Sequence, residues 1–316
     1  YRCINSLLIC LLFWIIVPQF NGLKFGFRCK KRIWGAVLLS FLVFSIFYYG
    51  LEIYPLTDLM AIFLCMAAVV LENKSREEKN NIRQIIFAFL MGIMIYWMYN
   101  VRTIYLFAGV YLVLMFFWHL YKASKRVASK VFSILSMVGG IGLAGLPQGY
   151  MNYFQCGEFS IKVPTSNLML KQIYWGILYQ RYETAYRDFE QFEQHPSYAI
   201  QFVDAVGQAL INKYEIEGFS TWQEVLNLIW KHPFDVGGIY IRHLVNMLFP
   251  CWPGQYVENL DSRKLVLAFL AYLFFFLFGI IVFNKCMKAL SIISNYFALL
   301  IPVFFILPGA VEARYF

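Results

Sequence analysis

The sequence predicts an all-α protein: a polytopic transmembrane helical bundle with a mostly helical non-cytoplasmic domain. Its 316 residues are 60% hydrophobic and only 14% charged, whereas a soluble domain carries about a quarter charged residues. Apolar runs near the ~20 residues that a spanning helix needs recur along the chain. Basic residues gather in alternate short loops. So little polar surface cannot cover so large a core, and lipid must therefore act as solvent for much of the chain.

Eight apolar stretches are predicted to be spans. They cover residues 3–20, 34–54, 56–71, 85–100, 104–120, 131–149, 265–284 and 289–308. They lack the period-two alternation of a membrane β-barrel, which favours helices. We therefore expect a transmembrane bundle of about six spans over 1–146, an extracytoplasmic domain over 147–263, and a C-terminal transmembrane pair over 264–316.

The distribution of charge predicts the orientation of these spans. Four short loops hold 15 of the 27 lysines and arginines, and these loops are 21–33, 72–84, 121–130 and 285–288. They alternate with the other connections, as the positive-inside rule requires of cytoplasmic loops. Segment 147–263 instead holds 12 of the 18 acidic residues. The net charge of +9 is thus interpreted as a signal of topology in a multi-pass membrane protein, and no nucleic-acid partner is expected.

Segment 147–263 is expected to be helical and rich in loops. Residues 222–230 have the pattern of an amphipathic helix that ends before Pro233. The run 237–248 is apolar but interrupted by Arg242 and His243. It predicts an interfacial or re-entrant helix near 236–250, with a ninth span as the alternative. Cys156 and Cys251 fall in or near this segment, and whether they pair in an oxidising compartment stays open.

Ionisable residues at the outer ends of the spans are the candidate site residues, because burying such groups is costly unless they are paired or wet. They are Glu52, Asp58, Asn100, Arg102, Arg242, His243, Glu312 and Arg314. Acids and arginines on one membrane surface are typical of a site for an anionic lipid headgroup. Each residue also has a structural interpretation. An arginine outside a span often anchors it at the interface, and Asp58 suits the N-terminus of a helix.

The motifs of common soluble enzymes are missing from the sequence. It holds no P-loop, no glycine-rich dinucleotide turn, no G-x-S-x-G and no H-E-x-x-H. No histidines or cysteines stand at metal-ligand spacing, so no metal site is predicted. The glycines at positions 139, 140, 142 and 145 lie in an apolar stretch, where we expect them to serve close helix packing.

Three segments together resemble the GT-C superfamily of membrane glycosyltransferases, the polyprenyl-phosphate-sugar-dependent type that includes the dolichyl-phosphate-mannose protein mannosyltransferases. Segment 48–59 is similar to the family's outer turn, in which an acid opens the next span. Segment 92–103 is similar to its glycine-containing span ending in Arg-Pro-Thr, although the proline is missing here. Segment 311–316 is similar to its late Glu-x-Arg-Tyr element.

The resemblance implies an integral membrane glycosyltransferase that moves a sugar from a polyprenyl-phosphate carrier to a glycan, lipid or protein on the outer face. Arg102 and Arg314 would hold the phosphate, with weaker roles for Arg242 and His243. Asp58, Glu52, Asn100 and Glu312 would support the site. A divalent cation is compatible with such chemistry, and no other cofactor is expected.

The start of the chain also resembles the beginning of the family's second span, through the Arg-x-x-Asn pattern of Arg2 and Asn5. The family's first span and first outer loop would then lie upstream of Tyr1. That loop usually holds the catalytic aspartate, so we expect the main catalytic acid to precede these residues.

Two other classes stay open. An O-antigen polymerase or ligase-like protein also combines many spans with a large outer loop, and it would use an undecaprenyl-linked polysaccharide as donor. A transporter is favoured less, because such proteins show internal repeats and charged mid-membrane helices, which this sequence lacks.

Overall fold

The computed structural model describes residues 58–123, 125–163, 168–184, 199–248, 289–306 and 308–309, together with Leu11. This part of the chain is 82% helical. It divides into two compact units. The first contains the four helices between residues 58 and 156 and most of the last described helix, and the second contains the elements between residues 168 and 248.

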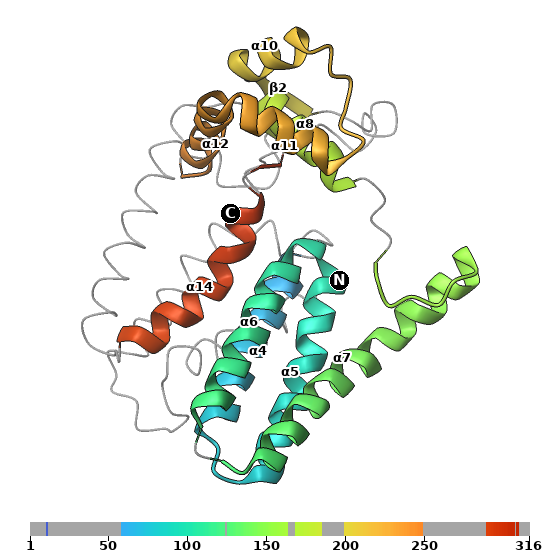
Figure 1. Cartoon of the computed structure of the whole chain (residues 1–316), viewed down its shortest axis with the longest axis vertical. Coiled ribbons are helices and arrows are strands. Elements are labelled where there is room, and N and C mark those ends of the chain that lie inside the picture. Colours follow the sequence, from blue (N-terminus) through green and yellow to red (C-terminus); the bar gives the residue numbers. More distant parts are fainter. Residues whose placement is uncertain are drawn as a thin grey trace. The chain divides into compact units, whose positions relative to one another are not determined.

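The first unit is a helical bundle. Its elements are α4 (Asp58–Glu77), α5 (Asn81–Val101), the 3-10 turn η2 (Thr103–Tyr105), α6 (Leu106–Lys122), α7 (Val127–Cys156) and the greater part of α14 (Ala289–Ile306). Short connections make α4, α5 and α6 antiparallel neighbours, and α7 packs along α5 (Figure 1). Each helix therefore begins at the end of the bundle where the previous one stops.

Three helices in the described part of the chain are long and apolar enough to cross a membrane. They are Asn81–Val101, Thr103–Lys122 and Val127–Cys156. They coincide with the predicted spans 85–100, 104–120 and 131–149 and extend each of them by several residues. The predicted spans 56–71 and 289–308 fall on α4 and α14. The predicted spans 3–20 (apart from Leu11), 34–54 and 265–284 lie outside the described residues.

Local signals set the ends of these helices. The Asn80 side chain caps α5, because its Oδ1 accepts hydrogen bonds from the backbone N–H groups of Ile82 and Arg83. Gly157 ends α7 with a φ of 77°, the left-handed conformation that glycine adopts without strain. Pro147 lies inside α7 without ending it. The helix therefore continues ten residues beyond the predicted bundle boundary at residue 146.

Helices α5 and α7 meet at unusually close range. A Cβ built on Gly92 of α5 would lie 2.1 Å from the carbonyl oxygen of Met137, and one built on Gly140 of α7 would lie 2.2 Å from the carbonyl oxygen of Phe89. The Ser136 hydroxyl donates to the carbonyl of Ile85 across the same interface, at 2.9 Å. Backbone-to-backbone contact of this kind is how small residues drive helix association in lipid.

The four glycines predicted to serve helix packing divide into two pairs. Gly140 packs against α5, and Gly145 makes room for Ile161, whose side chain would lie 2.9 Å from an added Cβ. At Gly139 and Gly142 an added Cβ meets no described residue within 4 Å. Close helix packing is confirmed for Gly140, whereas Gly145 makes room mainly for the segment that contains Ile161. Among the described residues, no helix packs against Gly139 or Gly142.

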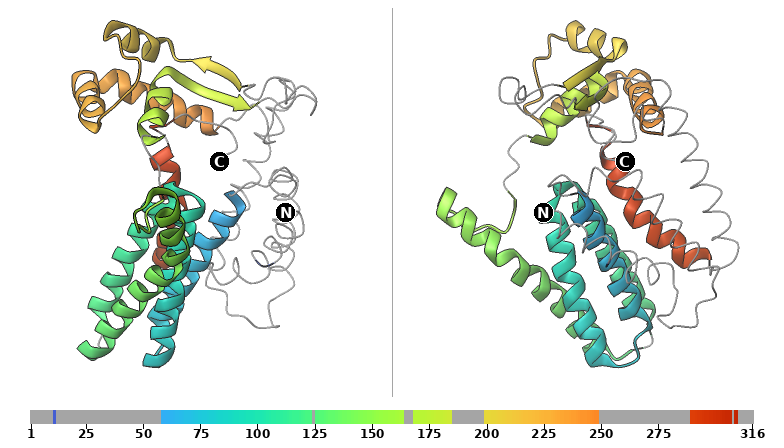
Figure 2. Two further views of the ribbon diagram at one scale, coloured as in Figure 1. Left: turned by 90° about the vertical axis from the view of Figure 1, so that its right-hand side faces the viewer. Right: turned by 180° about the vertical axis from the view of Figure 1, so that it is seen from behind.

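In its described residues, the second unit combines four helices with a two-stranded sheet (Figure 2). Its elements are α8 (Leu168–Leu178), β1 (Tyr179–Thr184), β2 (Ala199–Val203), α10 (Ala205–Lys213), α11 (Trp222–Lys231) and α12 (Pro233–Leu248). The strands are antiparallel, with Tyr182 opposite Gln201. The core is apolar and contains Leu170, Ile173, Ile177, Leu210, Ile211, Phe219, Val225, Leu228, Val236 and Ile239.

The second unit agrees in part with the expectation of a helical domain. Helix α11 lies where residues 222–230 predict it, and Thr221 caps it by accepting a hydrogen bond from the N–H of Glu224. Helix α12 covers most of the run 236–250 and begins at Pro233, a residue suited to the first helical position. The strand pair was not predicted from the sequence.

Candidate functional site

The predicted site residues fall into three groups. The side chains of Asn100 and Arg102 are described in the first unit, and those of Arg242 and His243 in the second. Asp58 is the first residue of α4, but its side chain is outside the described part. Three more predicted residues, Glu52, Glu312 and Arg314, also lie outside it.

Arg102 lies at the sharp turn between two helices. Its backbone N–H donates to the carbonyl of Met98 and closes the last turn of α5, at 3.0 Å. Its backbone is extended, with φ −146° and ψ 107°, and η2 starts at the next residue. This arrangement holds a half-buried arginine at the end of an apolar helix.

Asn100 starts a chain of side-chain amides that joins α5 to α7. Its Nδ2 donates to Oε1 of Gln148 at 2.9 Å. The Nε2 of Gln148 in turn donates to Oδ1 of Asn152, also at 2.9 Å. Asn152 is buried. Because buried amides need partners for both oxygen and nitrogen, this chain fixes the ends of the two helices relative to each other.

The segment 159–163 folds back over this end of the bundle. The Asn152 Nδ2 donates to the carbonyls of Ser160 and Lys162, the latter at 2.8 Å. Two tyrosines of α5 hold the same segment. The Tyr96 hydroxyl donates to the carbonyl of Ile161 at 2.7 Å, and the N–H of Val163 donates to the Tyr99 hydroxyl at 3.1 Å.

Glycine in α7 makes this close contact feasible. A Cβ at Gly149 would lie 2.6 Å from the ring of Phe159, so only glycine leaves room for that ring.

The contacts at this end of the bundle form what we call the amide end, defined by Tyr96, Tyr99, Asn100, Arg102, Gln148 and Asn152. Gln148 and Asn152 were not singled out from the sequence, although amides four residues apart in an apolar helix are a usable signal.

Arg242 of α12 forms a two-point ion pair in the second unit. Its Nε donates to Oδ2 of Asp204 at 2.6 Å, and its Nη2 donates to Oδ1 at 2.9 Å. Asp204 is fully buried and also caps α10, because Oδ1 accepts from the N–H groups of Val206 and Gly207 at 3.0 Å. Burial alone would raise the pKa of Asp204. The hydrogen bonds from Arg242 and the two backbone groups outweigh burial, and the pKa is lowered.

His243 follows Arg242 but is wholly buried. Its Nε2 lies 3.0 Å from the carbonyl oxygen of Tyr179, at the start of β1, so this nitrogen carries the proton and donates. Arg242 and His243 thus connect α12 to α10 and β1. Binding of phosphate by this pair stays a prediction, and a phosphate at Arg242 would compete with the Asp204 carboxylate.

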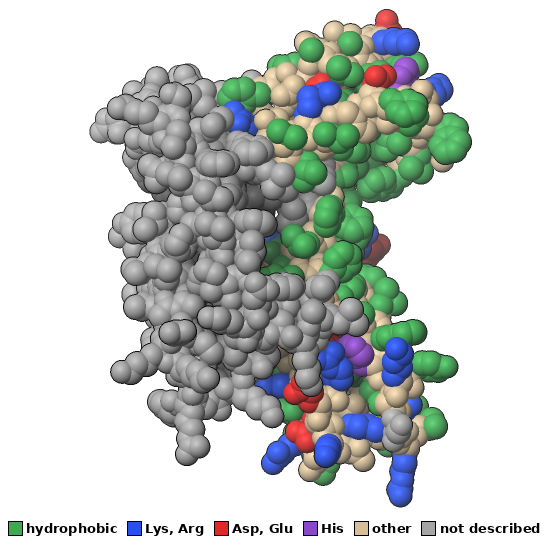
Figure 3. Space-filling model, turned by 90° about the vertical axis from the view of Figure 1, so that its left-hand side faces the viewer, with side chains coloured by type: hydrophobic (Ala, Val, Ile, Leu, Met, Phe, Trp, Pro, Cys, Tyr) green, Lys and Arg blue, Asp and Glu red, His purple; other side chains and the backbone are tan. Residues whose placement is uncertain are grey.

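Basic residues gather at the opposite end of the bundle from the amide end (Figure 3). Helices α4 and α6 end there, and α5 and α7 begin there. The basic residues in or beside these helix ends are Lys74, Arg76, Lys79, Arg83, Lys122, Lys125, Arg126 and Lys130. In the described residues, the bundle therefore has one end with strong positive charge and one end with an amide network beside the Arg102 turn.

In the part of the chain that the structure describes, no group of three or more histidine, cysteine, aspartate or glutamate residues is placed to hold a metal ion. The described part contains an exposed Cys156 at the end of α7, whereas Cys251 lies outside it.

Comparisons with protein-family models, with curated proteins and with solved structures find no significant match to this chain.

Proposed function

We propose that this chain belongs to an integral membrane glycosyltransferase that resembles the GT-C superfamily. In this proposal the protein transfers a sugar from a polyprenyl-phosphate carrier to a glycan, lipid or protein acceptor at the amide end of the bundle. The main supporting observation is the position of Arg102. It lies at the end of an apolar helix, on a turn fixed by neighbouring hydrogen bonds.

Sugar transfer from a lipid phosphate requires a cation beside the departing phosphate, because negative charge develops on that group in the transition state. A guanidinium suits this role, since its planar N–H groups match the oxygens of a phosphate. A rigid setting increases the effect, because the charge then needs no reorganisation during the reaction. The Asn100–Gln148–Asn152 chain supplies such rigidity beside Arg102.

The charge asymmetry of the bundle supports the proposed orientation. With the basic end in the cytoplasm, the amide end lies on the outer face, where the polyprenyl-phosphate donor would meet the acceptor. The family resemblance also assigns Arg314 to the phosphate and gives Glu312, Asp58 and Glu52 supporting roles.

The second unit presents an apolar face that supports contact with the lipid interface. Trp222, Leu226 and Trp230 follow each other at four-residue spacing in α11, and all three are exposed. Trp230 is 88% exposed and Phe234, one residue into α12, is 92% exposed. Large aromatic side chains on one face of an amphipathic helix are typical of segments that lie in the headgroup region.

The test is a transfer assay with the full-length protein in proteoliposomes and a set of polyprenyl-phosphate hexoses as donors. We expect Arg102→Ala to reduce transfer by about 100-fold or more, the usual loss when one group that stabilises developing charge is removed. Arg83→Ala is the matched control, because Arg83 is an exposed arginine at the opposite end of α5. Circular dichroism checks that both variants keep their helices. Full transfer by Arg102→Ala would contradict the proposed phosphate role.

A further inference from the structure

The basic end of the bundle contains a polar network that links three helices. Glu72 of α4 is only 5% exposed and pairs with Nδ1 of His119 in α6. The other ring nitrogen of His119 lies 3.5 Å from Nη1 of Arg76, one turn further along α4. Arg76 Nη2 donates to Oδ1 of Asn73 at 2.8 Å, and Nδ2 of Asn73 donates to Oδ1 of Asn295 in α14 at 3.1 Å.

The hydrogen-bond roles in this network are constrained by chemistry. An arginine N–H group only donates, so Nε2 of His119 is the acceptor and Nδ1 carries the proton toward Glu72. A neutral imidazole satisfies both neighbours in this way. The Glu72 carboxylate therefore accepts a hydrogen bond from Nδ1 of His119, and the Arg76 guanidinium lies at the opposite nitrogen of the same ring.

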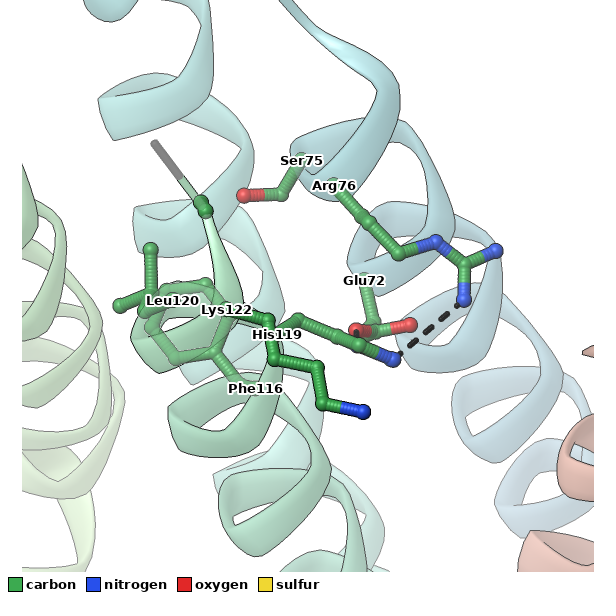
Figure 4. Close-up of a pocket in the computed structure, with 8 residues that line it drawn as sticks. Glu72, Ser75, Arg76, Phe116, His119, Leu120 and Lys122 are labelled. Carbon is green, nitrogen blue, oxygen red and sulfur yellow. Dashed lines mark hydrogen bonds and ion pairs between the residues drawn. The ribbon is translucent and has the colours of Figure 1, made fainter. Parts of the chain in front are cut away.

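A pocket of about 250 Å³ opens beside this network, between the C-terminal ends of α4 and α6 (Figure 4). Its walls are Glu72, Ser75, Arg76, Phe116, His119, Leu120, Lys122 and Ala123. One side of it is apolar, through Phe116 and Leu120. The other side carries two permanent cations, Arg76 and Lys122, against the single carboxylate of Glu72.

Ser75 is the residue that the network does not explain. It is 1% exposed, and within the described residues its hydroxyl oxygen has no hydrogen-bond partner. Figure 4 shows this hydroxyl directed from α4 toward the C-terminal end of α6. A buried hydroxyl without a partner is unfavourable. If the Glu72–His119 pair only joins α4 to α6, the burial of the Glu72 carboxylate is explained. The pocket and the unpaired hydroxyl of Ser75 are then left unexplained.

We propose that this pocket binds a phosphate group, carried by an anionic membrane lipid or present as free phosphate. The Ser75 hydroxyl would donate to one phosphate oxygen. Arg76 and Lys122 would supply the positive charge. The Nζ of Lys122 lies 4.4 Å from the centroid of the exposed Trp118 ring and would turn from that ring toward the phosphate. Phe116 and Leu120 would contact the apolar part of a lipid next to its headgroup.

The surroundings favour this class of ligand. The pocket lies among the basic residues of the bundle end, and such clusters attract anionic lipids to a membrane surface. Lys125 is not available to the pocket in the same way, because its Nζ donates to the Glu78 carbonyl and to Oε1 of Gln84, both at 2.7 Å. The site is separate from the amide end, so it does not depend on the proposed glycosyl transfer.

The experiment measures thermal unfolding of the full-length protein in a neutral maltoside detergent. Three additives are titrated: dioctanoyl-phosphatidylglycerol, dioctanoyl-phosphatidylcholine and inorganic phosphate. We expect a saturable rise in unfolding temperature with phosphatidylglycerol and a smaller one with phosphatidylcholine. An equal rise with inorganic phosphate would identify free phosphate as the source of the ligand. A rise with phosphatidylglycerol but not with inorganic phosphate would identify a lipid headgroup, and no rise with any additive would overturn the proposal.

Single substitutions distinguish binding in this pocket from general attraction of anions to the basic end of the bundle. Ser75→Ala and Arg76→Gln should each raise the half-saturating concentration by about tenfold, the effect of losing one hydrogen bond to a charged group. Arg83→Gln should leave it unchanged, because Arg83 is exposed at the same end but does not line the pocket. Without additive, Ser75→Ala should unfold at the wild-type temperature or above it. Equal weakening by all three variants, or no change with Ser75→Ala, would overturn the proposal.

Discussion

Gly140 of α7 lies directly against the backbone carbonyl of Phe89 in α5, so close that an added Cβ would be 2.2 Å from that oxygen. No side-chain rotation can relieve such a clash, because the position of a Cβ is fixed by its own backbone and the facing oxygen also belongs to the backbone. Gly140→Ala should therefore force the helices apart and destabilise the bundle by about 1–3 kcal/mol or more, the usual cost of overpacking. Thermal unfolding in detergent measures this loss.

Gly139 provides the matched control for that substitution. An added Cβ at Gly139 meets none of the residues that the structure describes within 4 Å, and alanine is a better helix former than glycine by up to about 1 kcal/mol. Gly139→Ala should therefore leave the unfolding temperature unchanged or raise it. Similar destabilisation by both variants would mean that α5 and α7 do not meet at Gly140.

Acid should weaken the second unit through Asp204. Its pKa lies below the ordinary 3.8 in the folded protein, so the unfolded chain takes up this proton first as the pH falls. The stabilisation is fully present well above pH 3.8 and is lost as the pH drops through the folded pKa. Urea unfolding of the full-length chain, followed by tryptophan fluorescence between pH 7 and pH 3, measures the effect.

Asp204→Asn isolates the contribution of the carboxylate. The amide oxygen can still cap α10, but the charged pair with Arg242 is gone. We expect a loss of about 1–3 kcal/mol at pH 7, below the value for a wholly buried pair because the Arg242 side chain is 35% exposed. The loss should shrink as the pH approaches 3. If the stability of Asp204→Asn fell with acid as steeply as that of the wild type, the acid sensitivity would belong to a group other than Asp204.

Asn152 should control the order of the segment 159–163. Asn152→Ala removes both hydrogen bonds to the carbonyls of Ser160 and Lys162 and interrupts the link to Gln148. Amide hydrogen exchange of peptides covering 159–163 should become at least about tenfold faster, since each lost hydrogen bond contributes about 1 kcal/mol. Gln155→Ala, which changes an exposed amide on the same helix, should leave the exchange as it is in the wild type.

Trp230 should lie in lipid. The contribution of Trp230 is the difference in tryptophan fluorescence between the wild-type protein and Trp230→Phe, both full-length and in vesicles. This contribution should be strongly quenched by bromine-labelled lipid and poorly quenched by iodide in the water phase. The physical reason is the 88% exposure of this indole in the chain alone, which is favourable at a membrane interface and unfavourable in water. Quenching by iodide and not by brominated lipid would show that α11 faces water.

The helices that the sequence predicted best are those whose signal is local. Each of α5, α6 and α7 is a long apolar run with a basic flank, and a spanning helix needs nothing more to be recognised. The strands β1 and β2 have no such signal. Residues 179–184 are mostly polar, and their partner strand begins fifteen residues later, so their pairing depends on tertiary packing that no local pattern reports.

The candidate site shows the same division. Asn100 and Arg102 were predicted because polar residues at the end of an apolar helix stand out in the sequence. Their neighbours Gln148 and Asn152 became visible only through the packing of α7 on α5. Asp204 was missed as the partner of Arg242 because 38 residues separate them. His119 carries no local sign in the sequence of the Glu72 carboxylate that α4 places beside it.

The 30 residues of α7 make the helix about 45 Å long, whereas the hydrocarbon layer of a bilayer is about 30 Å thick. If α7 crosses a membrane as proposed, part of it must tilt within the bilayer or project beyond it, and its last ten residues carry the amides. In longer-chain lipids the hydrocarbon boundary would then rise toward Gln148 and withdraw water from the network around Asn100. In shorter-chain lipids the same groups would be hydrated. The acyl-chain length of the host membrane would thus act on this end of the protein without changing a single residue.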